Sequence, residues 1–274
     1  MSVRSYFDLS QADRSGLGEQ IAQQRRRVTD RLGAVRSVVL VMSGKGGVGK
    51  SYVTAGLARA LAGGSGQAVG VLDADLRSPT VARLLGASGP LSVTDDGVAP
   101  ALGASGVKVM STEFLLHEGQ PLAWRGPSEE RFVWRGSLEV GTLREFLSDV
   151  RWGALDLLLI DLPPGADGAV ELGALIPNLT GALVVTIPTD ESRRSVSRTM
   201  RAAADAGIRL LGVVENMSGY RCAGCEETQP LFSGDAGARL AEEFCVPLLG
   251  AVPFAVNGQA PLQAIAVRLR EALP

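Results

Sequence analysis

A glycine-rich segment between two regular elements constrains the fold of this chain more than any other feature. Residues 44–51 read GKGGVGKS; they follow the apolar run at 37–42 and precede a helical pattern near 50–63. Clustered glycines let backbone N–H groups curl around an anion, and the start of a helix adds partial positive charge. The spacing G-x-x-x-x-G-K-S/T binds phosphates when it joins a buried strand to a helix. The sequence therefore predicts a nucleotide-binding α/β fold; the alternative is a glycine-rich turn that binds nothing.

Short apolar runs alternate with helical patterns along the rest of the chain. Strands are expected at 37–42, 68–72, 107–110, 155–160, 182–187, 210–215 and 248–252, and helices near 50–63, 78–86, 137–150, 190–206, 235–245 and 259–272. Almost wholly apolar runs such as VVLVM suit strands covered on both sides. The alternation predicts an α/β, doubly wound, mostly parallel sheet with helices on both faces, as one P-loop domain at 37–274. Residues 1–36 are polar and are expected to form a solvated helical leader.

Composition and charge argue against several function classes. The 274 residues include 27 Lys and Arg against 29 Asp and Glu, a formal net charge of −2, so neither a nucleic-acid nor a membrane partner is expected. The one histidine, His117, argues against histidine-dependent hydrolysis and against a histidine-rich metal site. Three cysteines are too few for a disulfide scaffold, and the N-terminus lacks an apolar signal segment. A reducing cytoplasm is the expected location.

The lysines of the chain gather in the glycine-rich segment. Only Lys45, Lys50 and Lys108 occur, and the first two lie within 44–51. Lys50 is expected to reach the β- and γ-phosphates of a nucleotide, and the Ser51 hydroxyl to ligate Mg²⁺. The expected nucleotide ligands are all the residues of the loop: Gly44, Lys45, Gly46, Gly47, Val48, Gly49, Lys50 and Ser51.

Carboxylates stand at the ends of two expected strands. Asp73 and Asp75 follow 68–72, and Asp161 follows 155–160. The carboxyl ends of strands face the ligand crevice of a doubly wound sheet. One carboxylate of the first pair is expected to orient the attacking water and the other to support Mg²⁺, unless they cap the next helix. An apolar strand that ends in aspartate indicates a Mg²⁺ ligand at Asp161, and the turn PPG at 163–165 is expected to sense hydrolysis.

Two of the three cysteines form a C-x-x-C pair. Cys222 and Cys225 can together ligate one soft metal centre, but a complete site needs two more thiolates. The same pair from a second chain at a two-fold interface would supply them. A bridging 4Fe-4S cluster and a Cys₄ zinc both fit this count, and a structural or redox pair is the alternative. Cys245 lies in an apolar passage and is expected in the core.

Two resemblances follow from these motifs. GKGGVGKS, with its extra Lys45, resembles the deviant Walker A loop of the MinD/ParA/nitrogenase-iron-protein class of ATPases. The chain between 38 and 254 resembles the Mrp/ApbC family of iron–sulfur carrier ATPases. The stretches that carry this likeness are GKGGVGKS, DADLRSPT, WRGS…FLSDVRWG, LDLLLIDLPPG, ENMSGYRCAGC and VPLLGAVPF.

The family resemblance implies a function. Its members are homodimers that bind ATP and Mg²⁺, hold a labile 4Fe-4S cluster at the CxxC and pass it to apo iron–sulfur proteins, with slow ATP hydrolysis as the gate. By resemblance, Lys45 reaches the partner's nucleotide, Asp75 positions the attacking water, Asn216 contacts the adenine, and Cys222 and Cys225 ligate the cluster. The resulting set of catalytic residues is Lys45, Lys50, Asp75 and Asp161.

The chain departs from the family pattern at three places. The family's PPGTGD is PPGADG at 163–168, which loses a hydroxyl and moves the acid, so the hydrolysis rate is in doubt. The family's YGPS is RSPT at 77–80. The element WRG occurs twice, at 124–126 and 134–136, and the first copy reads as an insertion.

Three other functions stay open at this point. A positioning or partition ATPase of the MinD/ParA type would need a DNA- or membrane-binding surface. A dimer with a structural Cys₄ zinc would keep the fold without the carrier activity. A reductase that passes electrons through a cluster, like the nitrogenase iron protein, is disfavoured because its cysteines lie far apart in sequence, unlike the CxxC at 222–225.

Overall fold

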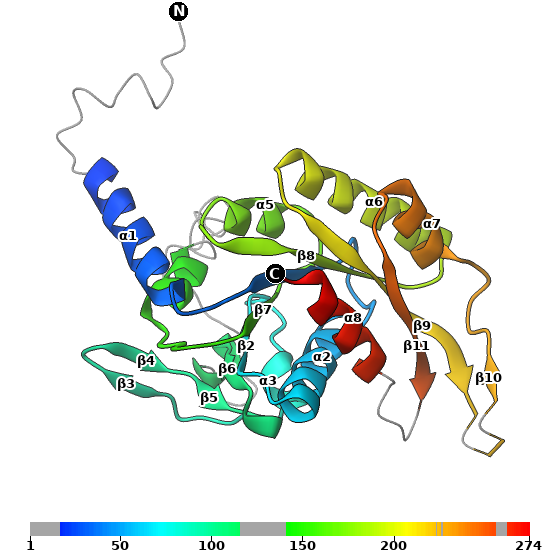
Figure 1. The fold of residues 1–274 in the computed structure, drawn as a ribbon, viewed down its shortest axis with the longest axis horizontal. Helices are drawn as coiled ribbons and strands as arrows, with labels where there is room; N and C mark the ends of the chain where they lie inside the picture. Colours follow the sequence, from blue (N-terminus) through cyan, green and yellow to red (C-terminus); the bar gives the residue numbers. More distant parts are fainter. Residues whose placement is uncertain (1–16, 116–140, 223, 226, 256–261) are drawn as a thin grey trace, which may run out of the picture.

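The computed structural model describes residues 17–115, 141–222, 224–225, 227–255 and 262–274 (Figure 1). The helices are α1 (Leu17–Leu32), α2 (Lys50–Ser65), α3 (Val81–Leu84), one at 141–149, α5 (Asp167–Gly173), α6 (Asp190–Asp205), α7 (Ala236–Glu243) and α8 (Leu262–Ala272). The strands are β1 (Val38–Met42), β2 (Val69–Asp73), β3 (Ser92–Thr94), β4 (Gly97–Ala99), β5 (Ala101–Leu102), β6 (Lys108–Met110), β7 (Leu157–Asp161), β8 (Leu179–Thr186), β9 (Leu210–Arg221), β10 (Thr228–Gln229) and β11 (Leu248–Ala255).

A mostly parallel sheet forms the centre of the molecule. Its strand order is β10-β9-β8-β1-β7-β2-β6-β5, and β11 pairs with β9. The inner pairs are all parallel, whereas β5 and β10 join their neighbours antiparallel. β3 and β4 form a separate hairpin. The doubly wound, mostly parallel sheet predicted from the sequence is confirmed.

Helices cover both faces of this sheet, as Figure 1 shows for α5, α6 and α7 on one side and α2, α3 and α8 on the other. Successive residues of β1 point to opposite faces: Leu40 lies in the hydrophobic cluster under the first group, and Val39 and Val41 lie in the cluster under the second. Because both faces are buried, β1 has no polar side, which explains its continuous apolar sequence.

Several elements differ from the expected ones. The helix expected near 78–86 is reduced to α3, α5 was not predicted, and of the helix expected near 137–150 the structure describes 141–149. β9 continues to Arg221 instead of ending at 215, because its last residues pair with β10 and with the end of β11. Such short edge pairings depend on tertiary contacts rather than on sequence periodicity.

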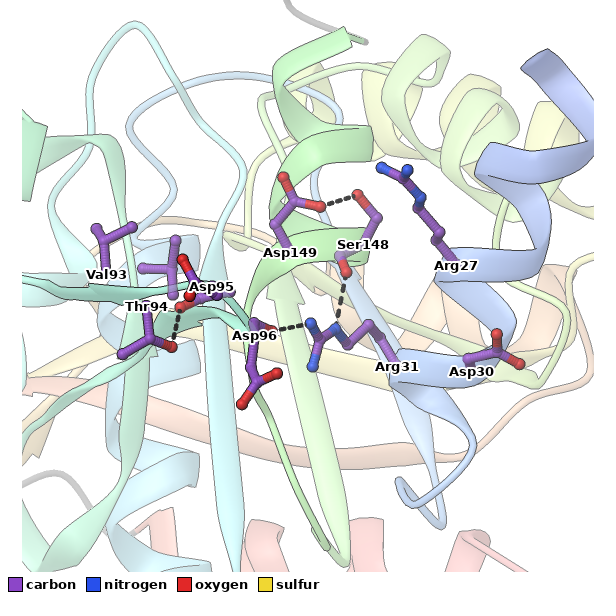
Figure 2. A pocket seen from close by; sticks show the side chains of 11 residues that line it. Arg27, Asp30, Arg31, Val93, Thr94, Asp95, Asp96, Ser148 and Asp149 are labelled. Atoms are coloured by element: carbon purple, nitrogen blue, oxygen red, sulfur yellow. Dashed lines mark hydrogen bonds between the residues drawn. The ribbon is translucent and has the colours of Figure 1, made fainter.

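The leader is less solvated than its composition predicts. Val28 and Leu32, in the second half of α1, are buried in the hydrophobic core. Figure 2 shows Arg31 reaching from α1 toward the β3–β4 turn and the helix at 141–149, where its guanidinium donates to the carbonyl oxygens of Ser148, at 3.0 Å, and Asp96. These contacts border a cavity of about 610 Å³.

Candidate functional site

The predicted site lies where three neighbouring parallel strands end. β1 lies beside β7, and β7 beside β2, so the loop at 44–51 and the carboxylates of Asp161 and Asp73 meet at one edge of the sheet. Asp73 and Asp161 are paired across β2 and β7. This is the carboxyl edge, where doubly wound sheets bind their ligands.

Glycines shape the loop between β1 and α2. Gly47 and Gly49 have φ values of 80° and 79°, in the left-handed region that favours glycine. Gly49 directly precedes α2, so Lys50 is the first residue of the helix. A β-carbon at Gly46 or Gly47 would meet almost nothing within 4 Å. The space beside these two residues is therefore open, as a loop that cradles phosphates requires.

A polar cluster joins the start of α2 to the end of β7. Lys50 Nζ lies 2.8 Å from Asp161 Oδ2, and the Ser51 hydroxyl donates to the same oxygen at 2.6 Å. The Thr54 hydroxyl donates to Asp161 Oδ1 at 2.7 Å. Asp161 is fully buried, and three side chains compensate its burial.

The same cluster fits a Mg²⁺–nucleotide. Apart from its ion pair, the buried Nζ of Lys50 has no hydrogen-bond partner among the described residues. An ammonium has three N–H donors, so Lys50 has capacity for phosphate oxygens. Ser51 and Asp161 present adjacent hydroxyl and carboxylate oxygens, the ligand type that Mg²⁺ prefers.

Asp73 caps the segment that leads into α3. Its Oδ2 accepts from the backbone N–H groups of Thr80, at 2.9 Å, and Val81, at 3.1 Å, and from the Ser111 hydroxyl at 3.3 Å. Burial and the nearby Asp161 carboxylate raise the pKa of Asp73 to about 7. The sequence predicted that Asp73 either supports the attacking water or Mg²⁺ or caps the next helix, and its contacts are those of a cap.

Asp75 lies apart from this buried cluster. It begins a turn in which its Oδ1 accepts from the Ser78 N–H at 3.2 Å. With Pro163, Pro164 and Asp167 it borders a cavity of about 490 Å³. The predicted water-positioning carboxylate and the turn predicted to sense hydrolysis therefore line the same cavity.

Two side chains from distant elements hold the loop in place. The Ser195 hydroxyl, on α6, donates to the Gly44 carbonyl at 2.6 Å, and Asn216 Nδ2, on β9, donates to the Val48 carbonyl at 2.9 Å. A β-carbon on Gly44 would overlap the α6 backbone, which explains the glycine there. Sequence analysis did not predict roles for Ser195 and Thr54. For Thr54 a signal existed, since it follows Lys50 by four positions and so shares a helix face with it.

The CxxC pair lies where β9 turns back toward β10. Cys222 is half-buried and Cys225 exposed, and the Cys222 N–H donates to the Glu227 carbonyl at 2.9 Å. Backbone N–H groups of Cys225 and Gly224, together with the Cys225 thiol, lower the pKa of Cys222. A thiol with a lowered pKa is more readily a thiolate, the form that ligates metals. No group of three or more His, Cys, Asp or Glu suited to a metal gathers within the described part of the chain.

The expectation that Cys245 lies in the core is wrong. Cys245 is exposed, with φ 52°, in the turn that follows α7. Its neighbours Phe244 and Val246 pack against the core instead. The apolar sequence around Cys245 thus indicated the burial of its neighbours, not its own.

Some residues predicted to matter lie outside the described residues or outside the buried cluster around Asp161. Both WRG elements, at 124–126 and 134–136, and His117 fall outside the described residues. Lys45 is half-buried at the start of the loop, and the CxxC follows the end of β9. Within the described residues, no helix is both long and apolar enough to cross a membrane.

Comparison with known proteins identifies the family. The sequence model described as "ParA: NUBPL iron-transfer P-loop NTPase" matches residues 34–133 and 128–264. The chain is 38% identical over 240 residues to the "Iron-sulfur cluster carrier protein" of Saccharolobus solfataricus, covering 87% of this chain and 78% of that one. It is 41% identical over 229 residues to the human "Cytosolic Fe-S cluster assembly factor NUBP2", covering 81% of each.

A solved structure agrees with these matches. The nucleotide-binding protein of Archaeoglobus fulgidus, in complex with ADP, superposes with a TM-score of 0.69 at 33% identity, over 91% of this chain and 94% of that one. The resemblance to iron–sulfur carrier ATPases predicted from the motifs is thereby confirmed. The chain belongs to the ParA family of NUBPL iron-transfer P-loop NTPases.

Proposed function

We propose that this protein is an ATP-dependent iron–sulfur cluster carrier that acts as a homodimer in the cytoplasm. The observation that carries the proposal is the presence, in one chain, of a phosphate loop facing Asp161 and an accessible CxxC at the end of β9. Relatives that span most of the chain bear names of iron–sulfur carriers and assembly factors. These names favour a carrier over a positioning ATPase of the MinD/ParA type.

The nucleotide half of the mechanism uses the loop and its surroundings. The backbone of residues 44–51 binds the phosphates, and Lys50 directs its spare N–H groups to the β- and γ-phosphates. Ser51 and Asp161 would hold Mg²⁺, which would neutralise phosphate charge. Asn216 contacts the adenine with the remaining capacity of its amide. Asp75 orients the attacking water from the edge of its cavity.

Lys45 acts on the nucleotide of the second copy. It is half-buried at the start of the loop and lies outside the buried cluster that Lys50 joins. A cation brought to the γ-phosphate from another subunit stabilises transition-state charge, as an arginine finger does. Lys45→Ala is therefore expected to abolish phosphate release from ATP while leaving nucleotide binding intact. Lys108→Ala, the change at the remaining lysine, is the matched control and retains hydrolysis.

The cargo half of the mechanism uses the CxxC. Cys222 and Cys225 supply two thiolates, so a 4Fe-4S cluster with four thiolate ligands needs the pair from a second copy. Because Cys225 is exposed and Cys222 only half-buried, an apo-protein acceptor can reach a cluster held there. Zinc accepts the same four thiolates, and the test below distinguishes the two metals.

Anaerobic reconstitution with iron and sulfide tests the proposal. We expect about four iron and four sulfide per dimer, lost in Cys222→Ala/Cys225→Ala and kept in Cys245→Ala, which removes the third cysteine as a control. The reconstituted protein should then activate an apo 4Fe-4S protein. Absence of iron in the wild type, equal iron in the double variant, or stoichiometric zinc that iron does not displace would refute the carrier function.

A further inference from the structure

β9 belongs to both halves of the proposed machinery. Its first half is a strand of the central sheet, and its last pair with β8 is Glu215 with Thr186. Beyond Glu215 it leaves β8 and continues with the end of β11 on one side and β10 on the other, up to Arg221. Figure 1 shows β9, β10 and β11 extending together toward the lower right. Cys222 follows directly.

Asn216 stands at the point where β9 leaves the central sheet. It is 5% exposed, and its Nδ2 donates to the Val48 carbonyl at 2.9 Å. A β-carbon on Gly49 would overlap this amide nitrogen, so the side chain is packed directly against the loop. The carbonyl of the peptide group between Val48 and Gly49 thus accepts a hydrogen bond from β9, while the N–H groups of the loop belong to the proposed phosphate site.

Met217 introduces a backbone irregularity immediately after Asn216. Its φ of 54° lies in the left-handed region, which is unfavourable for a residue other than glycine. The pairing of β11 with β9 shifts register at the same level, between Val252 and Phe254. Strained residues of this kind persist where surrounding structure imposes them and cluster at switch regions. The backbone of β9 is therefore irregular between its pairing with β8 and the strand end that precedes the cysteines.

We propose that Asn216 and Met217 couple the nucleotide loop to the cysteine pair within one chain. Asn216 is the positioning residue. When the Val48–Gly49 peptide changes orientation, the hydrogen bond from Asn216 moves the Asn216 side chain with it, and the backbone at Met217 transmits this movement to the end of β9. Cys222 follows Asn216 by six residues, roughly 20 Å of extended chain. This inference rests on the proposed function, because it assigns to that function the route by which nucleotide binding changes the accessibility of the cargo site.

Thiol alkylation of the apo-protein tests the coupling. Iodoacetamide labelling of Cys222 and Cys225 is followed by peptide-resolved mass spectrometry, without nucleotide and with saturating Mg²⁺–ADP; Cys245 serves as the internal reference. We expect ADP to change the labelling rate of the pair by at least about fivefold and to leave Cys245 unchanged. The ratio should stay constant on tenfold dilution, since the coupling acts within one chain.

Variants then locate the route. Asn216→Ala, compared with wild type at ADP concentrations that give equal measured occupancy, should reduce the labelling response to less than about twofold. Met217→Gly keeps the Asn216 amide but removes the backbone strain at 217, so it should also reduce the labelling response. This second variant tests the coupling even if Asn216→Ala binds ADP too weakly to be measured. Asn178→Ala is the matched control. Asn178 Nδ2 likewise donates to backbone carbonyls, of Leu32 and Val35, but Asn178 precedes β8, at the edge of the sheet opposite the nucleotide loop, so its response should equal wild type.

Three outcomes would overturn the coupling: an unchanged labelling rate in the wild type, a full response in both the Asn216 and Met217 variants, or a response that vanishes on dilution. These outcomes are separate from the fate of the carrier function. Cluster binding without a labelling response refutes the coupling alone, and a response in a chain that binds no iron refutes the carrier function alone.

Discussion

The Thr54 hydroxyl donates to Asp161 Oδ1 at 2.7 Å, in the buried space between α2 and β7. Ser51 and Lys50 both contact the other oxygen of Asp161, Oδ2. Because Thr54 bonds only Oδ1, Oδ2 stays available to the two residues proposed to bind Mg²⁺ and phosphate. A carboxylate held at one oxygen by a protein hydroxyl keeps its orientation while the other exchanges partners.

Thr54→Val tests whether the Thr54 hydroxyl orients the Asp161 carboxylate. The isosteric change leaves Asp161 Oδ1 without its donor in a buried site, which is expected to cost about 1–3 kcal/mol of unfolding free energy. Mg²⁺–nucleotide affinity should fall as well, measured by calorimetric titration. Thr199→Val is the control, because Thr199 is also buried and donates to the carbonyl four residues earlier, as Thr54 does, but hydrogen-bonds no carboxylate among the described residues. Equal losses in the two variants would contradict a special role for Thr54.

The buried carboxyl of Asp73 predicts a pH dependence of stability. Burial, and then the Asp161 carboxylate, raise its pKa from 3.8 to about 7. A carboxyl whose folded pKa is raised binds its proton more tightly in the folded than in the unfolded chain. Its contribution to stability is therefore full below pH 3.8 and is lost as the pH rises to 7. Without nucleotide and Mg²⁺, the unfolding free energy should fall by on the order of 2–3 kcal/mol between pH 5 and 7.

Urea unfolding of the wild type and Asp73→Asn at several pH values checks this expectation. The amide does not titrate, so the variant should gain stability relative to wild type as the pH rises from 5 to 8, whatever its loss at pH 5. Titrating groups that do not interact with Asp73 are common to both proteins and cancel in the difference. A difference that stays constant with pH would show that Asp73 does not titrate in this range.

The environment of Cys222 predicts a reactive thiol. Backbone N–H groups of Cys225 and Gly224 lower its pKa, which enlarges the thiolate fraction at neutral pH. In the apo-protein at pH 7, iodoacetamide should modify Cys222 faster than it modifies glutathione. The advantage should disappear above about pH 9, where an ordinary thiol is also ionised. An advantage that persists at high pH would mean that access, not ionisation, sets the rate.

The sequence predicted the parts of the molecule that local patterns specify. The loop at 44–51, the apolar strands and Asp161 follow from spacing and periodicity, and the parallel sheet follows from their alternation. Contacts between distant segments could not be predicted from local patterns. The hydrogen bond from Ser195 to Gly44 joins residues 151 positions apart, and the one from Asn216 to Val48 joins residues 168 positions apart. Cys245 shows the same limit, since the apolar character of its neighbours could not reveal the left-handed turn that exposes its side chain.

Arg31 predicts how firmly the leader is attached. Its guanidinium bonds backbone carbonyls of Ser148 and Asp96, so it ties α1 both to the helix at 141–149 and to the β3–β4 turn (Figure 2). Arg31→Ala leaves these carbonyls without their charged donor, and a loss of about 1.5–3 kcal/mol of unfolding free energy is expected. Arg27→Ala is the matched control, because Arg27 lines the same cavity from the same helix and is exposed. Hydrogen exchange should show faster exchange of α1 in Arg31→Ala than in Arg27→Ala. Equal exchange in the two variants would mean that burial of Val28 and Leu32 alone holds the helix in place.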